Sequence, residues 1–208
     1  MLPKLLLLCG VLAPLLYAVA DTLAGRRWEG YSFRDQAISE LGAIGAPSRP
    51  LFAILLIAVY LLFAAFGVGV WKSAAGRRGI RVAGGLLIAL GVMALTVGQF
   101  VPMQPRGNEQ GLTGALHLIE GMVAMLLVLA AMGFAAAALG RRFRLYTIAS
   151  IVVVVAFGAW SGMDAPAVEA GLPTPWLGVK ERIFWYAYQL WFLVLAVTLL
   201  RERGASEG

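Results

Sequence analysis

Residues 51–71 read LFAILLIAVYLLFAAFGVGVW, an unbroken apolar run without a charged side chain. The hydrocarbon core of a membrane is about 30 Å thick, and a helix needs about 20 apolar residues to cross it. This run is therefore predicted to be a membrane-spanning helix. Working outward in both directions, five further apolar segments meet the same criterion, at 5–23, 82–101, 112–139, 145–162 and 183–200. The sequence predicts an all-α membrane protein, a six-transmembrane-helix bundle in which residues 1–208 form a single transmembrane domain.

Composition supports this class and argues against a nucleic-acid partner. The chain has 208 residues, of which 61% are hydrophobic and 13% charged, and its net charge is +6. In a soluble domain that excess of positive charge would suggest phosphate binding, but here the basic residues lie in short links between apolar runs. The one cysteine, Cys9, lies inside the first apolar run, so a disulfide framework is excluded.

The distribution of basic residues predicts the orientation. Six spans place both termini on one side, and cytoplasmic links are enriched in lysine and arginine. The links on the side of the termini are short and almost purely basic, so both termini are predicted to be cytoplasmic. These residues are Lys4, Lys72, Arg77, Arg78, Arg81, Arg141, Arg142, Arg144, Arg201 and Arg203. The first span also resembles a cleavable secretory signal ending at Ala18-Val19-Ala20. We expect it to be retained, because the domain that follows itself spans the membrane.

Two local patterns concern packing and the outer links. Gly84, Gly91 and Gly98 recur every seven residues on the third span, which predicts one helical face that admits a neighbouring helix closely. The third outer link, 163–181, contains three prolines and is expected to be an irregular cover instead of a helix.

The first outer link, 26–50, is predicted to contain a short amphipathic surface helix. Ser32 followed by Asp35 is typical of a helix start, and Gly42 is placed to end the helix. Apolar residues between them fall on one face, which suits a helix lying on the outer membrane surface. These apolar residues are Phe33, Ala37, Ile38 and Leu41.

Most polar side chains within or beside the apolar segments lie on the side opposite the basic links. Charge in or beside hydrocarbon is costly, so its concentration on one side indicates a functional site. The residues of this outer group are Asp21, Gln99, His117, Glu120, Ser161, Asp164, Glu181 and Arg182.

Within this group, His117 and Glu120 are the candidates for chemistry. They are three residues apart and therefore share one helical face. His117 is suited to act as acid or base, with Ser39 or Ser161 as a nucleophile, although neither serine lies in a Gly-x-Ser-x-Gly sequence. Because the chain has one histidine, we expect no metal and no cofactor. Alternatively, the pair is structural and ties the fourth span to Arg182 or to the surface helix.

Arg182 has two possible roles. Its guanidinium group could hold a phosphate bidentately, or it could pair with Glu40 or Glu120 inside the bundle. Pairing is the expectation. The complete set predicted for binding is Asp21, Asp35, Glu40, Gln99, Asp164, Glu181 and Arg182, with His117, Glu120 and Ser39 as the catalytic candidates.

Several segments together resemble a known family. They are DQAISELGA at 35–43, FVP at 100–102, His117 early in the fourth span and GVKER at 178–182. The combination is similar to the bacterial and archaeal six-span family called domain of unknown function 998. The resemblance implies an integral multi-pass protein of the prokaryotic plasma (inner) membrane, and it implies no established activity. Its motif residues Asp35, Ser39, Glu40, His117, Glu181 and Arg182 coincide with polar residues of the outer side. An Ile-Ser motif in the first outer link and His117 in the fourth span after a Phe-Pro-like turn also resemble, more faintly, the six-span Frag and autophagy-modulator group, which is linked to lipid remodelling and so points towards lipids.

The sequence is compatible with three functions. His117 is expected about 8 Å below the start of its span, at the depth of lipid head groups. This favours binding or modification of a lipid head group, with membrane lipids as partners and with catalysis left open. The alternatives are a structural or accessory membrane subunit without a ligand and a small-solute transporter. A transporter would need polar groups through the inner half, where the sequence offers few.

Overall fold

The computed structural model describes residues 2–108 and 111–207 and is helical throughout its regular elements. The six long helices are α1 (Leu2–Arg27), α2 (Arg49–Lys72), α3 (Arg78–Phe100), α4 (Leu112–Ala138), α5 (Arg141–Gly162) and α7 (Leu177–Glu207). Two short elements also lie within the described residues, the 3-10 helix η1 (Ser39–Gly42) and α6 (Ala165–Glu169). In this described part of the chain, six helices are long and apolar enough to cross a membrane. The predicted all-α six-span architecture is confirmed.

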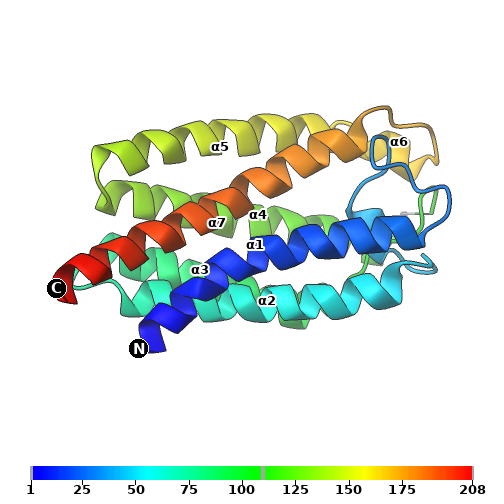
Figure 1. Ribbon diagram of the computed structural model, residues 1–208. Helices are drawn as coiled ribbons and strands as arrows, with labels where there is room; N and C mark the ends of the chain where they lie inside the picture. The colour runs from blue at the N-terminus through cyan, green and yellow to red at the C-terminus, as the bar shows by residue number, and fades with distance from the viewer. Residues whose placement is uncertain (1, 109–110, 208) are drawn as a thin grey trace.

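The long helices run side by side along one axis, so the molecule has two distinct ends (Figure 1). The N- and C-termini lie together at one end, which we call the terminal end. The segment between α1 and α2 lies with α6 at the other end, which we call the loop end. Helix α1 packs between α2 and α7, α3 packs between α2 and α4, and α5 contacts α4 and α7. The six long helices therefore form a ring.

Large apolar side chains occupy both the interior and the outer surface of this ring. Tyr17, Phe66, Trp191 and Phe192 are buried in the centre. Outward-facing residues such as Leu126, which is 66% exposed, are equally apolar. A contiguous exposed apolar surface of this extent is unusual for a soluble monomer, and it fits a protein surrounded by lipid.

Close helix packing follows the glycine pattern of the third span. A Cβ atom built on Gly84 would lie 2.5 Å from the backbone nitrogen of Trp71, and one built on Gly91 would lie 2.6 Å from that of Ala64. These two glycines thus allow the backbones of α2 and α3 to approach directly, as the spacing predicts. Gly98 instead faces α4, where its Cβ would lie 3.4 Å from Oε1 of Glu120.

The first outer link differs from the predicted surface helix. Residues 32–36 form a turn in which the Gln36 N–H donates to the Ser32 carbonyl at 2.9 Å, and η1 follows as a short 3-10 helix. The backbone N–H groups of Ala37 and Ile38 donate to the carboxylates of Glu40 and Glu181, which draws them out of an α-helical pattern. The apolar residues Ala37, Ile38 and Leu41 are buried against the bundle and do not lie on a membrane surface.

The short helix η1 does end at Gly42, but without the left-handed backbone that a glycine cap would adopt. Gly42 is absent from the glycines with a positive φ, and the next residue, Ala43, is extended with a φ of −62° and a ψ of 153°. The third outer link also differs, because α6 forms within it and α7 already begins at Leu177. Pro166 near the start of α6 is compatible with a helix, since the first turn needs no intrahelical N–H donor.

Candidate functional site at the loop end

Asp21 near the end of α1 and Arg182 near the start of α7 form a buried ion pair. The Arg182 Nη2 and Nε groups donate to the two Asp21 carboxylate oxygens at 2.7 and 3.0 Å. The Tyr186 hydroxyl donates to the same carboxylate at 2.8 Å. Arg182 also donates to the Tyr31 hydroxyl at 2.9 Å and to the Phe33 carbonyl at 2.8 Å. The guanidinium group is therefore fully engaged within the protein.

Glu40, in η1, forms the second buried ion pair of the loop end. Arg106, from the link between α3 and α4, donates to its two carboxylate oxygens at 2.5 and 3.1 Å. The same carboxylate accepts the Ala37 backbone N–H at 2.9 Å and the Gln36 side-chain amide at 3.2 Å. Arg106 further donates to the Leu172 carbonyl at 2.9 Å, which ties the second and third outer links together.

Two further acidic residues of the predicted binding set, Glu181 and Asp164, are also hydrogen-bonded within the protein. Glu181 accepts the backbone N–H of Ile38, and Asp164 accepts a hydrogen bond from Lys180. The Lys180 ammonium lies 5.3 Å from the centre of the Trp160 ring, within range of a cation–π interaction.

Asp35 joins the first outer link to the third. Its carboxylate accepts the Arg34 Nε–H at 2.9 Å and the Trp176 backbone N–H at 3.0 Å. The Thr174 hydroxyl donates to the Asp35 carbonyl at 2.8 Å. The hydrogen bonds from Arg34 and Trp176 favour the ionised form and lower the pKa of Asp35 to about 2. Burial raises the pKa of Tyr31, in the same link.

Through these contacts, most residues of the predicted polar group share one role, which is to hold the links and helices of the loop end together. Buried charges are stable when they are paired and hydrogen-bonded, and each pair here joins a loop to a helix, a loop to a loop or one helix to another. Arg182 pairs with Asp21 and not with Glu40 or Glu120, which were the expected partners. The partner of Glu40 is Arg106, which sequence analysis did not single out. Arg106 is the one basic residue in the link between α3 and α4, and this was the sequence feature that could have identified it.

His117 and Glu120 remain outside this network. The His117 Nδ1 lies 2.9 Å from the Val101 carbonyl oxygen. A carbonyl only accepts, so Nδ1 carries a proton, and in the neutral ring Nε2 presents a lone pair. Within the described residues neither Nε2 nor the Glu120 carboxylate makes a hydrogen bond, and the two side chains are not bonded to each other.

The surroundings of these two side chains are open to the lipid side of the ring. In the loop-end half of α4, Ile119 is 49% exposed and Met122 is 60% exposed, whereas His117 and Glu120 themselves are half-buried. Gln99, near the end of α3, donates its amide to the Ala94 carbonyl at 3.1 Å. His117 and Glu120 thus lie between the lipid-facing and core-facing sides of α4.

The other sequence candidates are positioned separately. Ser39 lies in η1 and is partly buried, and within the described residues no hydrogen bond joins its hydroxyl, or that of Ser161, to His117. The described residues also contain no group of three or more histidine, cysteine, aspartate or glutamate side chains that could hold a metal ion. Because neither serine hydroxyl is hydrogen-bonded to His117, a serine–histidine mechanism stays a prediction.

The fold and the loop-end network define a multi-pass helical membrane protein whose outer links are held to its helices by buried ion pairs. A family model described as Protein of unknown function (DUF998) matches residues 11–198. The chain belongs to this family. No curated protein and no solved structure matches the chain.

Proposed function

We propose that the protein binds a membrane lipid in the leaflet at the loop end, and that His117 and Glu120 contact the lipid head group. One observation carries this proposal. Asp21, Glu40, Asp164 and Arg182 are ion-paired within the protein and Glu181 is hydrogen-bonded to a backbone N–H, while His117 Nε2 and the Glu120 carboxylate keep unused hydrogen-bonding capacity. Polar groups at this depth in a membrane helix are costly, which favours a ligand that uses them.

The chemistry of the two side chains defines the kind of head group. The Nε2 lone pair and an ionised carboxylate are both acceptors. The ligand must then supply donors, such as the hydroxyl groups of a sugar or glycerol or an ammonium group. A phosphate alone would offer only further acceptors, and Arg182, the predicted phosphate ligand, is engaged with Asp21. Modification of the bound lipid would use His117 Nε2 as the general base.

The proposal includes an orientation. The terminal end faces the cytoplasm, and the membrane is the prokaryotic plasma membrane. Support comes from the basic segments 72–81 and 141–144, which lie at the connections from α2 to α3 and from α4 to α5 at the terminal end. The lipid site then opens to the outer leaflet.

A second candidate function, that of a structural or accessory subunit without a ligand, is favoured by the pairs Asp21–Arg182, Glu40–Arg106 and Asp164–Lys180. These pairs fix the outer links whether or not a ligand binds. On this interpretation His117 serves only to hold the Val101 carbonyl at the end of α3. The two candidates make different predictions for the same variant.

The test is native mass spectrometry of the purified protein together with its thermal unfolding. We expect His117→Ala and Glu120→Gln to lose a co-purifying lipid that the wild type and the exposed control Glu29→Gln retain, and Glu120→Gln to unfold near the temperature of the wild type. Under either candidate function His117→Ala should lower the stability by about 1–3 kcal/mol, because the Val101 carbonyl loses its donor. Lipid retention is therefore the readout that separates the two functions, and a structural role predicts that both variants keep the lipid. Unchanged lipid retention in both variants would refute the binding proposal.

A further inference from the structure

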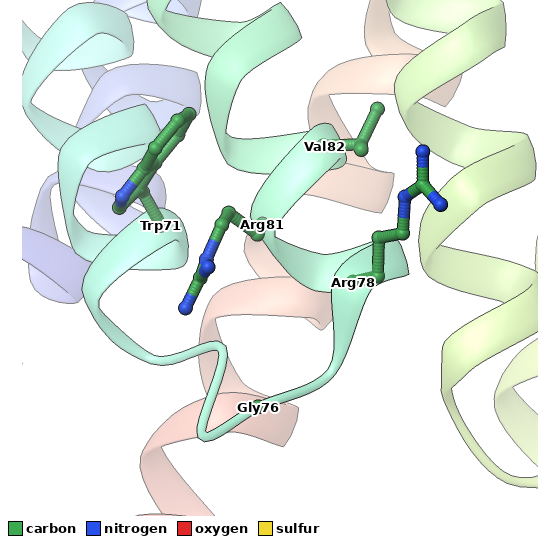
Figure 2. A pocket seen from close by; sticks show the side chains of 5 residues that line it. All are labelled: Trp71, Gly76, Arg78, Arg81 and Val82. Atoms are coloured by element: carbon green, nitrogen blue, oxygen red, sulfur yellow. The ribbon is translucent and has the colours of Figure 1, made fainter.

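A hollow at the terminal end is separate from the network described above. It has a volume of about 420 Å³ and is lined by Trp71, Gly76, Arg78, Arg81 and Val82. Figure 2 shows these residues around the connection between α2 and α3, with Arg81 between Trp71 and Arg78. The hollow lies where two membrane-spanning helices end, and therefore at the level of the membrane surface.

The tight connection between α2 and α3 leaves the hollow open. Ala75 and Gly76 both adopt a positive φ, of 45° and 84°, which turns the chain sharply back into α3. A Cβ atom built on Gly76 would meet nothing within 4 Å. The space beside the turn is thus not filled by other parts of the described chain.

The polar side chains that line the hollow are all donors. Trp71 offers an indole N–H, and Arg78 and Arg81 offer guanidinium groups, and none of these groups can accept a hydrogen bond. The guanidinium groups of Arg78 and Arg81 make no hydrogen bond or ion pair with any described residue, whereas the neighbouring Arg77 pairs with Glu202 at 2.8 Å. In Figure 2 the Arg81 side chain extends towards the turn between α2 and α3. Among the described residues, no acidic side chain lines this space.

A site made only of donors, with two positive charges, requires an anion with several acceptors. Guanidinium groups bind phosphate bidentately, and basic pockets between helices at the cytoplasmic surface suit anionic lipid head groups. Trp71 and Val82 add an apolar wall suited to the glycerol and upper acyl region. We propose that this hollow binds the phosphate group of an anionic membrane lipid, in the leaflet opposite the one assigned to His117. The proposal is independent of the function proposed for the loop end.

The experiment titrates the full chain in neutral detergent with phosphatidylglycerol, phosphatidylcholine or inorganic phosphate and measures the unfolding temperature. We expect phosphatidylglycerol to raise the unfolding temperature of the wild type more than phosphatidylcholine does. Arg81→Gln and Arg78→Gln should each weaken this response about tenfold in lipid concentration. The matched control is Arg201→Gln, which removes the same charge from an exposed position outside the hollow.

Two further arms keep the outcome decisive. Trp71→Phe keeps the aromatic wall and removes the indole N–H, so it should weaken the response to phosphatidylglycerol and leave the response to phosphatidylcholine unchanged. A response of Arg78→Gln and Arg81→Gln equal to that of Arg201→Gln would overturn the proposal. So would a full stabilisation by inorganic phosphate alone, because the lipid would then contribute nothing.

Discussion

Replacing Arg182 by Met tests the buried ion pair between α1 and α7. The side chains of Arg182 and Asp21 are only 13% and 4% exposed. Without the guanidinium group, Asp21 keeps one hydrogen bond, from Tyr186, and the Phe33 carbonyl loses its donor. Removal of one partner from a buried pair costs about 3–5 kcal/mol. For a chain of this length, each kcal/mol lowers the unfolding temperature by about 2–4 °C, so the total decrease should be roughly 6–20 °C.

The assay is thermal unfolding in detergent, followed by the intrinsic fluorescence of the six tryptophans. The control is Arg34→Gln, which removes an arginine paired with an aspartate in the same region but 62% exposed, and the unfolding temperature should barely change. A double-mutant cycle isolates the pair. Asp21→Leu combined with Arg182→Met should be less destabilised than the sum of the two single variants by about 1–3 kcal/mol. Strict additivity, or a loss no larger than that of Arg34→Gln, would refute the reasoning.

Three other predictions follow from the same structure. Gly84→Ala should lower the unfolding temperature strongly, because the added Cβ would meet the backbone of Trp71. Gly133→Ala is the control and should be tolerated, because the space around Gly133 is open. Equal tolerance of the two variants would contradict the close packing of α2 and α3. The depressed pKa of Asp35 means that its contribution to stability is present above about pH 4 and is lost as the pH falls towards 2. The unfolding temperature of Asp35→Asn should therefore fall less between about pH 4 and pH 2 than that of Glu29→Gln. Parallel curves of unfolding temperature against pH for the two variants would contradict the contacts of Asp35. In a Cys9→Ala background, cysteines at Ala75 and Arg142 should resist an impermeant thiol reagent in intact cells and one at Asn108 should react; labelling at Arg142 would reverse the proposed orientation.

The number and positions of the spans could be predicted from sequence because hydrophobicity over about 20 residues is a property of each segment alone. The run 51–71, for example, lies within α2, which extends from Arg49 to Lys72. Gly84 and Gly91 were informative for the same local reason, since their spacing alone places them on one helical face. The first outer link was different. Its pattern fits an amphipathic helix, but Glu40 and Glu181 compete for the backbone N–H groups of Ala37 and Ile38.

The candidate site was predictable as a region and not as a set of partners. Asp21, Glu40, Glu181 and Arg182 do gather at one end, because every outer link returns to the same side of the membrane. Which acid meets which base depends on the order of helices around the ring, and no local pattern encodes that order. Helix α1 contacts α7, so Asp21 meets Arg182, while Glu40 meets Arg106 from a link whose single arginine carries no motif.

The Asp21–Arg182 pair also bears on how the chain is made. The two residues are 161 positions apart, so at about 5–20 residues per second the ribosome completes Arg182 roughly 8–30 s after Asp21. During that interval the first helix is in place without its counter-ion. The segment 31–36 also lacks a partner during this interval, because Tyr31 and the Phe33 carbonyl bind the same guanidinium group. The last helix therefore completes the loop end, and a nascent chain that stops short of Arg182 leaves Asp21, Tyr31 and the Phe33 carbonyl without this guanidinium partner.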